Sequence, residues 1–185
     1  MELNHKTFGA GEPIIILHGL FGTLDNWQTV AKKLAEHYMV YIVDQRNHGR
    51  SAHVEGQNYK LMAEDLADFM EENWIHNAHI IGHSMGGQTI RMLDYLLKTA
   101  ITDSSLKYEE SQLLGQINEG WIKSITSIST PHNGTTLSDI VTSGIPFLQD
   151  FIGLAAVVGN SFYNFDLEHW GFKRDGEETW GSYFS

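Results

Sequence analysis

Residues 78–87 have the sequence AHIIGHSMGG, an apolar run that ends in a serine between glycines. The segment GHSMG at 82–86 matches the pattern G-x-S-x-G, in which a serine sits on a sharp turn between a strand and a helix. Its glycines permit the strained turn and leave room for the Ser84 hydroxyl to project at the helix N-terminus. A chance match in an ordinary turn is the alternative. The motif predicts a strand, a helix and Ser84 as a nucleophile.

Two more short apolar runs, PIIIL at 13–17 and MVYIV at 39–43, are similar to the run at 78–81. Runs of this length between turn residues are typical of strands that are buried on both faces of a parallel sheet. The segment IKSITSIST at 122–130 is rich in β-branched residues and predicts a further strand. The three-residue spacing of its isoleucines would also suit a helix.

Apolar residues recur at helical spacing between these runs. A first helix is expected after Asp25, its N-cap, and a later helix from Gly87 to about Lys98. The helix between them has an apolar stripe of Met62, Leu66, Phe69 and Met70 and an outward acidic face of Glu64, Asp65, Asp68, Glu71 and Glu72. Strands that alternate with helices predict the α/β class, with right-handed βαβ units and a doubly wound, mainly parallel sheet. Chemistry is expected beyond the carboxyl ends of the strands.

Two loops at those strand ends carry candidate residues. In HGLFG at 18–22, the backbone N–H of Leu20 is predicted to join that of Met85 in binding an oxyanion when Ser84 attacks an ester carbonyl. A glycine-rich turn that only connects two elements is the alternative. The loop DQRNHGRS at 44–51 has a spacing that fits no standard metal site, so we interpret it as a hydrogen-bonded structural loop.

Composition restricts the class of partner. The formal charge is −11 with no local Lys/Arg cluster, which disfavours nucleic acid and anionic membrane surfaces. The chain contains no cysteine, which excludes disulfides, thiolate metal sites and a cysteine nucleophile. There is no run of 18 apolar residues and no signal-peptide pattern, so we expect no transmembrane segment. The length of 185 residues predicts a single domain over 1–185.

Two family resemblances follow from longer stretches of sequence. Up to about residue 87 the chain resembles small cytoplasmic esterases of the α/β-hydrolase superfamily, through PIIILHGLFGTLDNW, YIVDQRNHGRSAH, YKLMAEDLADFM and GHSMGG. From residue 82 onward it resembles secreted staphylococcal and thermophilic-bacillus triacylglycerol lipases, through GQTIRMLDYLL, ITSISTPHNGTTL and FDLEHWGFKR. Because the two meet at a motif that both families share, we interpret the sequence as a natural or engineered chimera. The resemblance leaves the compartment open between cytoplasm and secretion.

The resemblance also implies what the sequence contains and lacks. The apolar segment at 136–172 would be a helical lid over the site, with an ordinary core helix as the alternative. In both families the catalytic histidine and acid follow later strands, so the domain is expected to be C-terminally incomplete. His132 in TPHNG is the best substitute base, although the resembled lipases do not use this histidine as one. The zinc-binding insertion is missing and the calcium site lies further downstream, so we expect no metal and no cofactor.

The resulting function is a carboxylic-ester hydrolase, an esterase or lipase, that acts on a small-molecule or lipid ester through an acyl-enzyme at Ser84. The alternative from another class is a catalytically incomplete α/β-hydrolase scaffold that binds acyl chains or a partner. A third interpretation is an acyltransferase or perhydrolase on the same fold. An open edge after the last predicted strand would allow a homo-oligomer to form by strand pairing.

Overall fold

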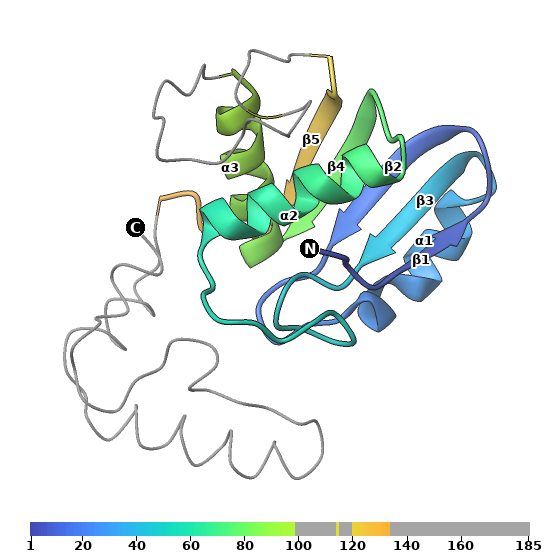
Figure 1. The fold of residues 1–185 in the computed structure, drawn as a ribbon. Coiled ribbons are helices and arrows are strands. Elements are labelled where there is room, and N and C mark those ends of the chain that lie inside the picture. Colours follow the sequence, from blue (N-terminus) through green and yellow to red (C-terminus); the bar gives the residue numbers. More distant parts are fainter. Residues whose placement is uncertain (99–113, 115–119, 134–185) are drawn as a thin grey trace, which may run out of the picture. The chain divides into compact units, whose positions relative to one another are not determined.

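The computed structural model describes residues 1–98, 114 and 120–133 (Figure 1). By its internal contacts the chain forms two units, residues 1–53 with 59–130 and residues 54–58 with 131–185. The first unit contains a mainly parallel sheet with helices between its strands, which confirms the predicted α/β class. The expected lid at 136–172 lies outside the described residues. The prediction of a single domain stays a prediction.

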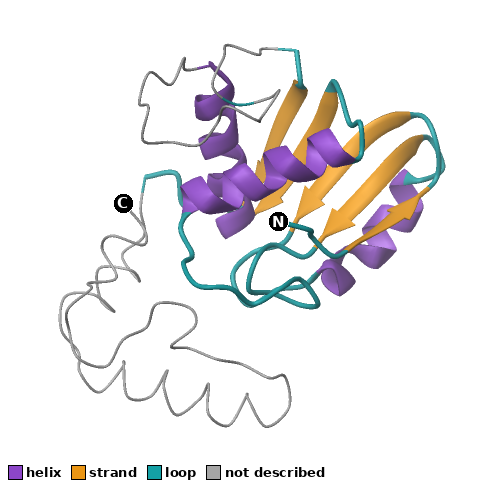
Figure 2. Cartoon of the chain, viewed as in Figure 1, coloured by secondary structure: helices purple, strands orange, loops and turns teal. Residues whose placement is uncertain are grey.

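The sheet has five strands in the order β1-β3-β2-β4-β5 (Figure 2). Their bounds are β1 (His5–Phe8), β2 (Glu12–Leu17), β3 (Tyr38–Val43), β4 (Ala78–His83) and β5 (Ile122–Ile128). All pairs are parallel except β1 with β3, which is antiparallel. Strand β1 was not predicted, because HKTF is short and mostly polar. Strand β5 ends two residues before the predicted limit.

The pairing register brings the candidate loops together. Leu17, the last residue of the central strand β2, pairs with Val43 on one side and with Gly82 on the other. The segments that follow these three residues therefore leave the sheet at the same edge, as expected for parallel strands.

The helices are η1 (Leu24–Trp27), α1 (Gln28–Leu34), α2 (Tyr59–Glu72) and α3 (Met85–Lys98). The expected N-cap at Asp25 is wrong, because the first helical segment is the 3-10 turn η1 and its cap is Thr23. The Thr23 N–H donates to Asn26 Oδ1 at 2.8 Å, while Asp25 is exposed and pairs with Lys6. Helix α3 begins at Met85, two residues before the predicted start.

The sheet separates two hydrophobic clusters. In β2, Ile15 and Leu17 belong to the cluster that contains apolar side chains of α2 and α3. Ile14 and Ile16 belong to the cluster on the other face, with Leu24 and Ala31 from η1 and α1. Figure 1 shows α2 crossing one face of the sheet and α1 behind it. Burial on both faces explains why the β2 sequence is continuously apolar rather than alternating.

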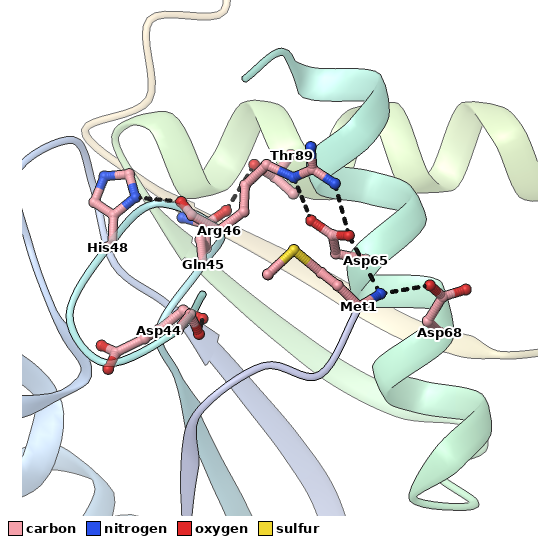
Figure 3. Close-up of polar contacts among 9 residues, drawn as sticks. Met1, Asp44, Gln45, Arg46, His48, Asp65, Asp68 and Thr89 are labelled. Carbon is pink, nitrogen blue, oxygen red and sulfur yellow. Dashed lines mark hydrogen bonds and ion pairs between the residues drawn. The ribbon is translucent and has the colours of Figure 1, made fainter. Parts of the chain in front are cut away.

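One residue of the acidic face predicted for the second helix, Asp65, is buried rather than directed outward. Asp65 is 3% exposed, and both of its carboxylate oxygens accept hydrogen bonds from Arg46, from Nε at 2.5 Å and from Nη2 at 2.8 Å (Figure 3). The terminal ammonium of Met1 lies 3.6 Å from the same carboxylate and 2.9 Å from Asp68. A carboxylate placed between two cations can be buried on the core side of a helix, which an amphipathic pattern does not predict.

Within residues 1–98, 114 and 120–133, no helix combines the length and the hydropathy needed to cross a lipid bilayer.

Candidate active site

Ser84 lies between the last residue of β4 and the first residue of α3. Its φ is 51°, in the left-handed region that non-glycine residues rarely adopt and that is commonly found at functional sites. The Ser84 N–H donates to Ile128 O at 2.9 Å, and the Gly87 N–H donates to Ser84 O at 3.1 Å. The turn is thereby tied both to the end of β5 and to the first turn of α3. The predicted strand-turn-helix context of the motif is confirmed.

Three glycines allow the segments around Ser84 to approach one another. A Cβ on Gly19 would lie 2.8 Å from Ser84 Cβ, and a Cβ on Gly86 would lie 2.8 Å from His18 O. A Cβ on Gly87 would lie 2.0 Å from Thr130 Oγ1. Real Cβ contacts are longer than these, so side chains at the three positions would push the segments apart. The loop at 18–22 thus lies directly against the serine turn.

The Gly19 carbonyl has two donors. His18 Nδ1 lies 2.8 Å from Gly19 O, and the Gly22 N–H donates to the same oxygen at 2.9 Å. This carbonyl and the Leu20 N–H belong to one planar peptide group, in which they point in opposite directions. Fixing the carbonyl therefore also fixes the direction of the Leu20 N–H, one of the two predicted oxyanion donors. The other, the N–H of Met85, belongs to the first residue of α3.

His18 is buried, at 1% exposure, and its tautomer follows from its partners. The Gln45 N–H donates to His18 Nε2 at 3.1 Å, so Nε2 is unprotonated and Nδ1 carries the hydrogen that is donated to Gly19 O. Burial is the main cause that lowers the pKa of His18, which keeps the ring neutral. We interpret His18 as a residue that orients the loop rather than as a base for Ser84.

Gln45 and Thr89 were not singled out by the sequence. The Gln45 side chain donates from Nε2 to His18 O at 2.8 Å. Its Oε1 accepts from the Thr89 hydroxyl, also at 2.8 Å (Figure 3). Both residues are buried, at 3% and 0% exposure. The only available signal was the position of Gln45, two residues after the end of β3, a strand that neighbours β2. Its partner on α3 could not be identified without the fold.

The loop at 44–51 has the structural character that its sequence suggested. Asp44 accepts hydrogen bonds from Asn4 Nδ2 at 2.6 Å, from the Leu24 N–H at 2.7 Å and from the Arg50 N–H at 3.0 Å. These donors come from the segment before β1, from η1 and from the loop itself. A carboxylate with three such donors holds these segments together. Asp44 is therefore engaged in structure rather than directed at Ser84.

The described residues contain no group of three or more His, Asp or Glu side chains arranged to hold a metal ion. His132, the suggested substitute base, is exposed and belongs to the second unit. Its role toward Ser84 stays a prediction.

Known proteins support the class that this fold and turn indicate. Residues 12–100 match the family model described as "alpha/beta hydrolase fold". The chain is 43% identical over 106 residues to Esterase YbfF of Escherichia coli, an alignment that covers 55% of this chain and 42% of the esterase. It is 38% identical over 111 residues to a lipase of Staphylococcus hyicus, with 55% of this chain and 17% of the lipase covered.

A solved structure extends the likeness in fold. The structure described as "Est816 as an N-Acyl homoserine lactone degrading enzyme" aligns with a TM-score of 0.61 and 22% identity, over 82% of this chain and 50% of that protein. The chain spans less than half the length of the two curated relatives.

The fold is of the α/β-hydrolase type, and the relatives that the chain matches over part of its length are named an esterase and a lipase.

Proposed function

We propose that this protein is a carboxylic-ester hydrolase that acts through an acyl-enzyme at Ser84. The observation that carries the proposal is the φ of 51° at Ser84, on a turn held at both ends by backbone hydrogen bonds. A strained serine costs stability, and a half-buried serine at a helix N-terminus is where a nucleophile of this motif is expected. Relatives named as an esterase and a lipase support the same chemistry.

In the proposed reaction, Ser84 Oγ attacks the ester carbonyl and the carbonyl oxygen becomes an oxyanion. The N–H groups of Leu20 and Met85 donate hydrogen bonds to that oxyanion. The alcohol leaves with a proton, and water then releases the acid from Ser84. A base must accept the Ser84 proton. The buried, neutral His18 donates its own hydrogen to Gly19 O and is committed to that contact.

The experiment is a comparison of ester hydrolysis and covalent labelling on the full chain. Purified protein is mixed with p-nitrophenyl acetate, p-nitrophenyl palmitate and, separately, a p-nitrophenyl alkylphosphonate. Release of p-nitrophenol is followed by absorbance, and the phosphonate adduct by intact mass and peptide mapping. We expect one adduct, on the peptide that contains Ser84.

Two variants make the assignment specific. Ser84→Ala should lose both the adduct and the enzymatic release of p-nitrophenol, whereas Ser127→Ala, which removes an exposed hydroxyl on β5, should keep both. Labelling without ester turnover would indicate a nucleophile whose base and acid are supplied outside these residues. A folded protein without adduct would exclude the acyl-enzyme and favour the binding scaffold.

A further inference from the structure

We propose that Gln45 is a positioning residue that holds the two oxyanion donors in register, an inference that rests on the proposed function. The donors belong to different parts of the chain, Leu20 to the loop after β2 and Met85 to the start of α3. Gln45 belongs to neither segment, and its side chain hydrogen-bonds to a residue of each, His18 in the loop and Thr89 in α3. Its location after β3 places it beside the end of β2, because Val43 pairs with Leu17.

The first arm of this bridge reaches the loop after β2. Gln45 Nε2 donates to His18 O at 2.8 Å, and the Gln45 backbone N–H donates to His18 Nε2 at 3.1 Å. The second contact leaves the ring hydrogen on Nδ1, where it reaches Gly19 O at 2.8 Å. Gln45 therefore fixes the His18 carbonyl directly. Through the His18 imidazole it also fixes the Gly19 carbonyl, whose peptide group contains the Leu20 N–H.

The second arm reaches α3. Thr89 Oγ1 lies 2.8 Å from Gln45 Oε1 and 3.4 Å from Met85 O, so its single hydrogen favours the amide oxygen. Thr89 lies one helical turn after Met85, on the same face of α3. Holding Thr89 against Gln45 therefore sets the distance of the first turn of α3 from the loop at 18–22.

Burial makes the bridge stiff. His18, Gln45 and Thr89 are exposed by 1%, 3% and 0%, respectively, so water does not compete freely for these contacts. A buried polar group that loses its partner has no ready substitute, and the surrounding segments shift to find one. A shift of either donor changes hydrogen bonds that matter most in the transition state, because preorganised donors stabilise the charge that develops there.

The experiment compares a p-nitrophenyl phosphonate with the corresponding thiophosphonate on the full chain. In each case Ser84 Oγ bonds to phosphorus, p-nitrophenolate leaves with the bonding electron pair, and the hydroxyl proton passes to the solvent. The P=O oxygen accepts hydrogen bonds in the oxyanion position, and the P=S sulfur accepts them weakly. The ratio of the two labelling rates therefore reports on the donors rather than on the nucleophile.

Three variants test the two arms. Gln45→Leu removes the side-chain contacts of both arms and keeps the Gln45 backbone N–H that donates to His18. Thr89→Val removes the hydroxyl with almost no change in shape, and Thr89→Ser restores it. We expect Gln45→Leu and Thr89→Val to slow labelling by the phosphonate by about 10-fold to 100-fold. The rate of labelling by the thiophosphonate should fall much less, so that the ratio of the phosphonate rate to the thiophosphonate rate drops. Thr89→Ser should return the ratio toward that of the unchanged protein. Thr29→Val, at an exposed position of α1, serves as the matched control.

The outcomes separate the two proposals. If the unchanged protein is not labelled at Ser84, the proposed function fails and the role of Gln45 falls with it. If labelling occurs but Thr89→Val lowers both rates by the same factor, Thr89 and Gln45 only stabilise the fold and the positioning role is refuted. A Gln45→Leu variant that does not fold leaves the decision to Thr89→Val and its Thr89→Ser counterpart.

Discussion

Gly86 and Leu17 lie so close that a Cβ on the glycine would be 2.9 Å from the Cβ of the leucine and 2.9 Å from its carbonyl oxygen. The contact joins the first turn of α3 to the end of the central strand. Because one of the atoms in the way belongs to the backbone, no change of rotamer can relieve an overlap there.

Gly86→Ala tests the importance of this approach. An alanine would favour the helix by about 1 kcal/mol through backbone propensity, but the overlap with β2 and with His18 O should cost more than that. We expect a net loss of about 1–3 kcal/mol in the free energy of unfolding, measured by urea denaturation followed by circular dichroism. Gly120→Ala is the control, since among the described residues no atom beyond its chain neighbours lies within 4 Å of the added Cβ. Equal stability of the two variants would contradict this account.

The strained backbone at Ser84 predicts that glycine is more stable than alanine at this position, the reverse of the order expected in a strand. At a φ of 51°, a side chain of any kind is unfavourable, so Ser84→Gly should be more stable than Ser84→Ala by about 1 kcal/mol. At Ser124, within the exposed strand β5, the same pair should have the opposite order, because glycine weakens a strand. Chemical denaturation of the four variants gives both differences. An alanine variant at position 84 as stable as the glycine variant would show that the turn is not strained.

Much of this arrangement could be predicted from the sequence, for identifiable reasons. Strands β2, β3 and β4 are buried on both faces, so their sequences are short apolar runs, a pattern typical of the interior of a parallel sheet. The serine turn combines a glycine-framed motif with an apolar strand before it, and that combination placed Ser84 correctly in the fold. Strand β1 lacked such a pattern, since its residues are mostly polar and it is stabilised by pairing with β3.

Contacts between distant segments could not be predicted in this way. Asp65 has the helical position of an exposed acid, and the locations of Arg46, nineteen residues earlier, and of the Met1 ammonium make its burial favourable. Gln45 and Thr89 are separated by 44 residues and carry no motif. Their association depends on the order of the strands, which places the end of β3 next to β2 and brings α3 into reach.

Because Asp65 forms a buried ion pair with Arg46, replacement of its carboxylate by an amide should strongly destabilise the fold. Asp65→Asn would remove the negative charge that faces the buried Arg46 guanidinium, and we expect a loss of about 3 kcal/mol in the free energy of unfolding. Asp94→Asn breaks the exposed pair with Lys98 and should cost less than about 0.5 kcal/mol. Urea denaturation at neutral pH measures both. If the two losses are similar, the buried pair is not an essential contact.

The buried histidines predict a loss of stability in mild acid. Burial is the largest cause that lowers the pKa of His48, to about 2, and it also lowers the pKa of His18. Below the ordinary value of 6.5 the unfolded chain binds a proton at each position that the folded protein does not bind, so stability falls as the pH falls. Each histidine should contribute up to about 1.4 kcal/mol per pH unit to this slope.

His48→Gln isolates one of these contributions. Between pH 6.5 and pH 5, the free energy of unfolding of the variant should fall less steeply than that of the unchanged protein, by up to about 1.4 kcal/mol per pH unit. The measurement is a series of urea denaturation curves at fixed ionic strength, and the slope rather than the absolute stability is compared, because the substitution also disturbs the contact between His48 Nδ1 and Arg46 O. His37→Gln, at an exposed position after α1, is the control for the loss of an imidazole. A slope for His48→Gln as steep as that of the unchanged protein would mean that His48 takes up its proton in the folded state.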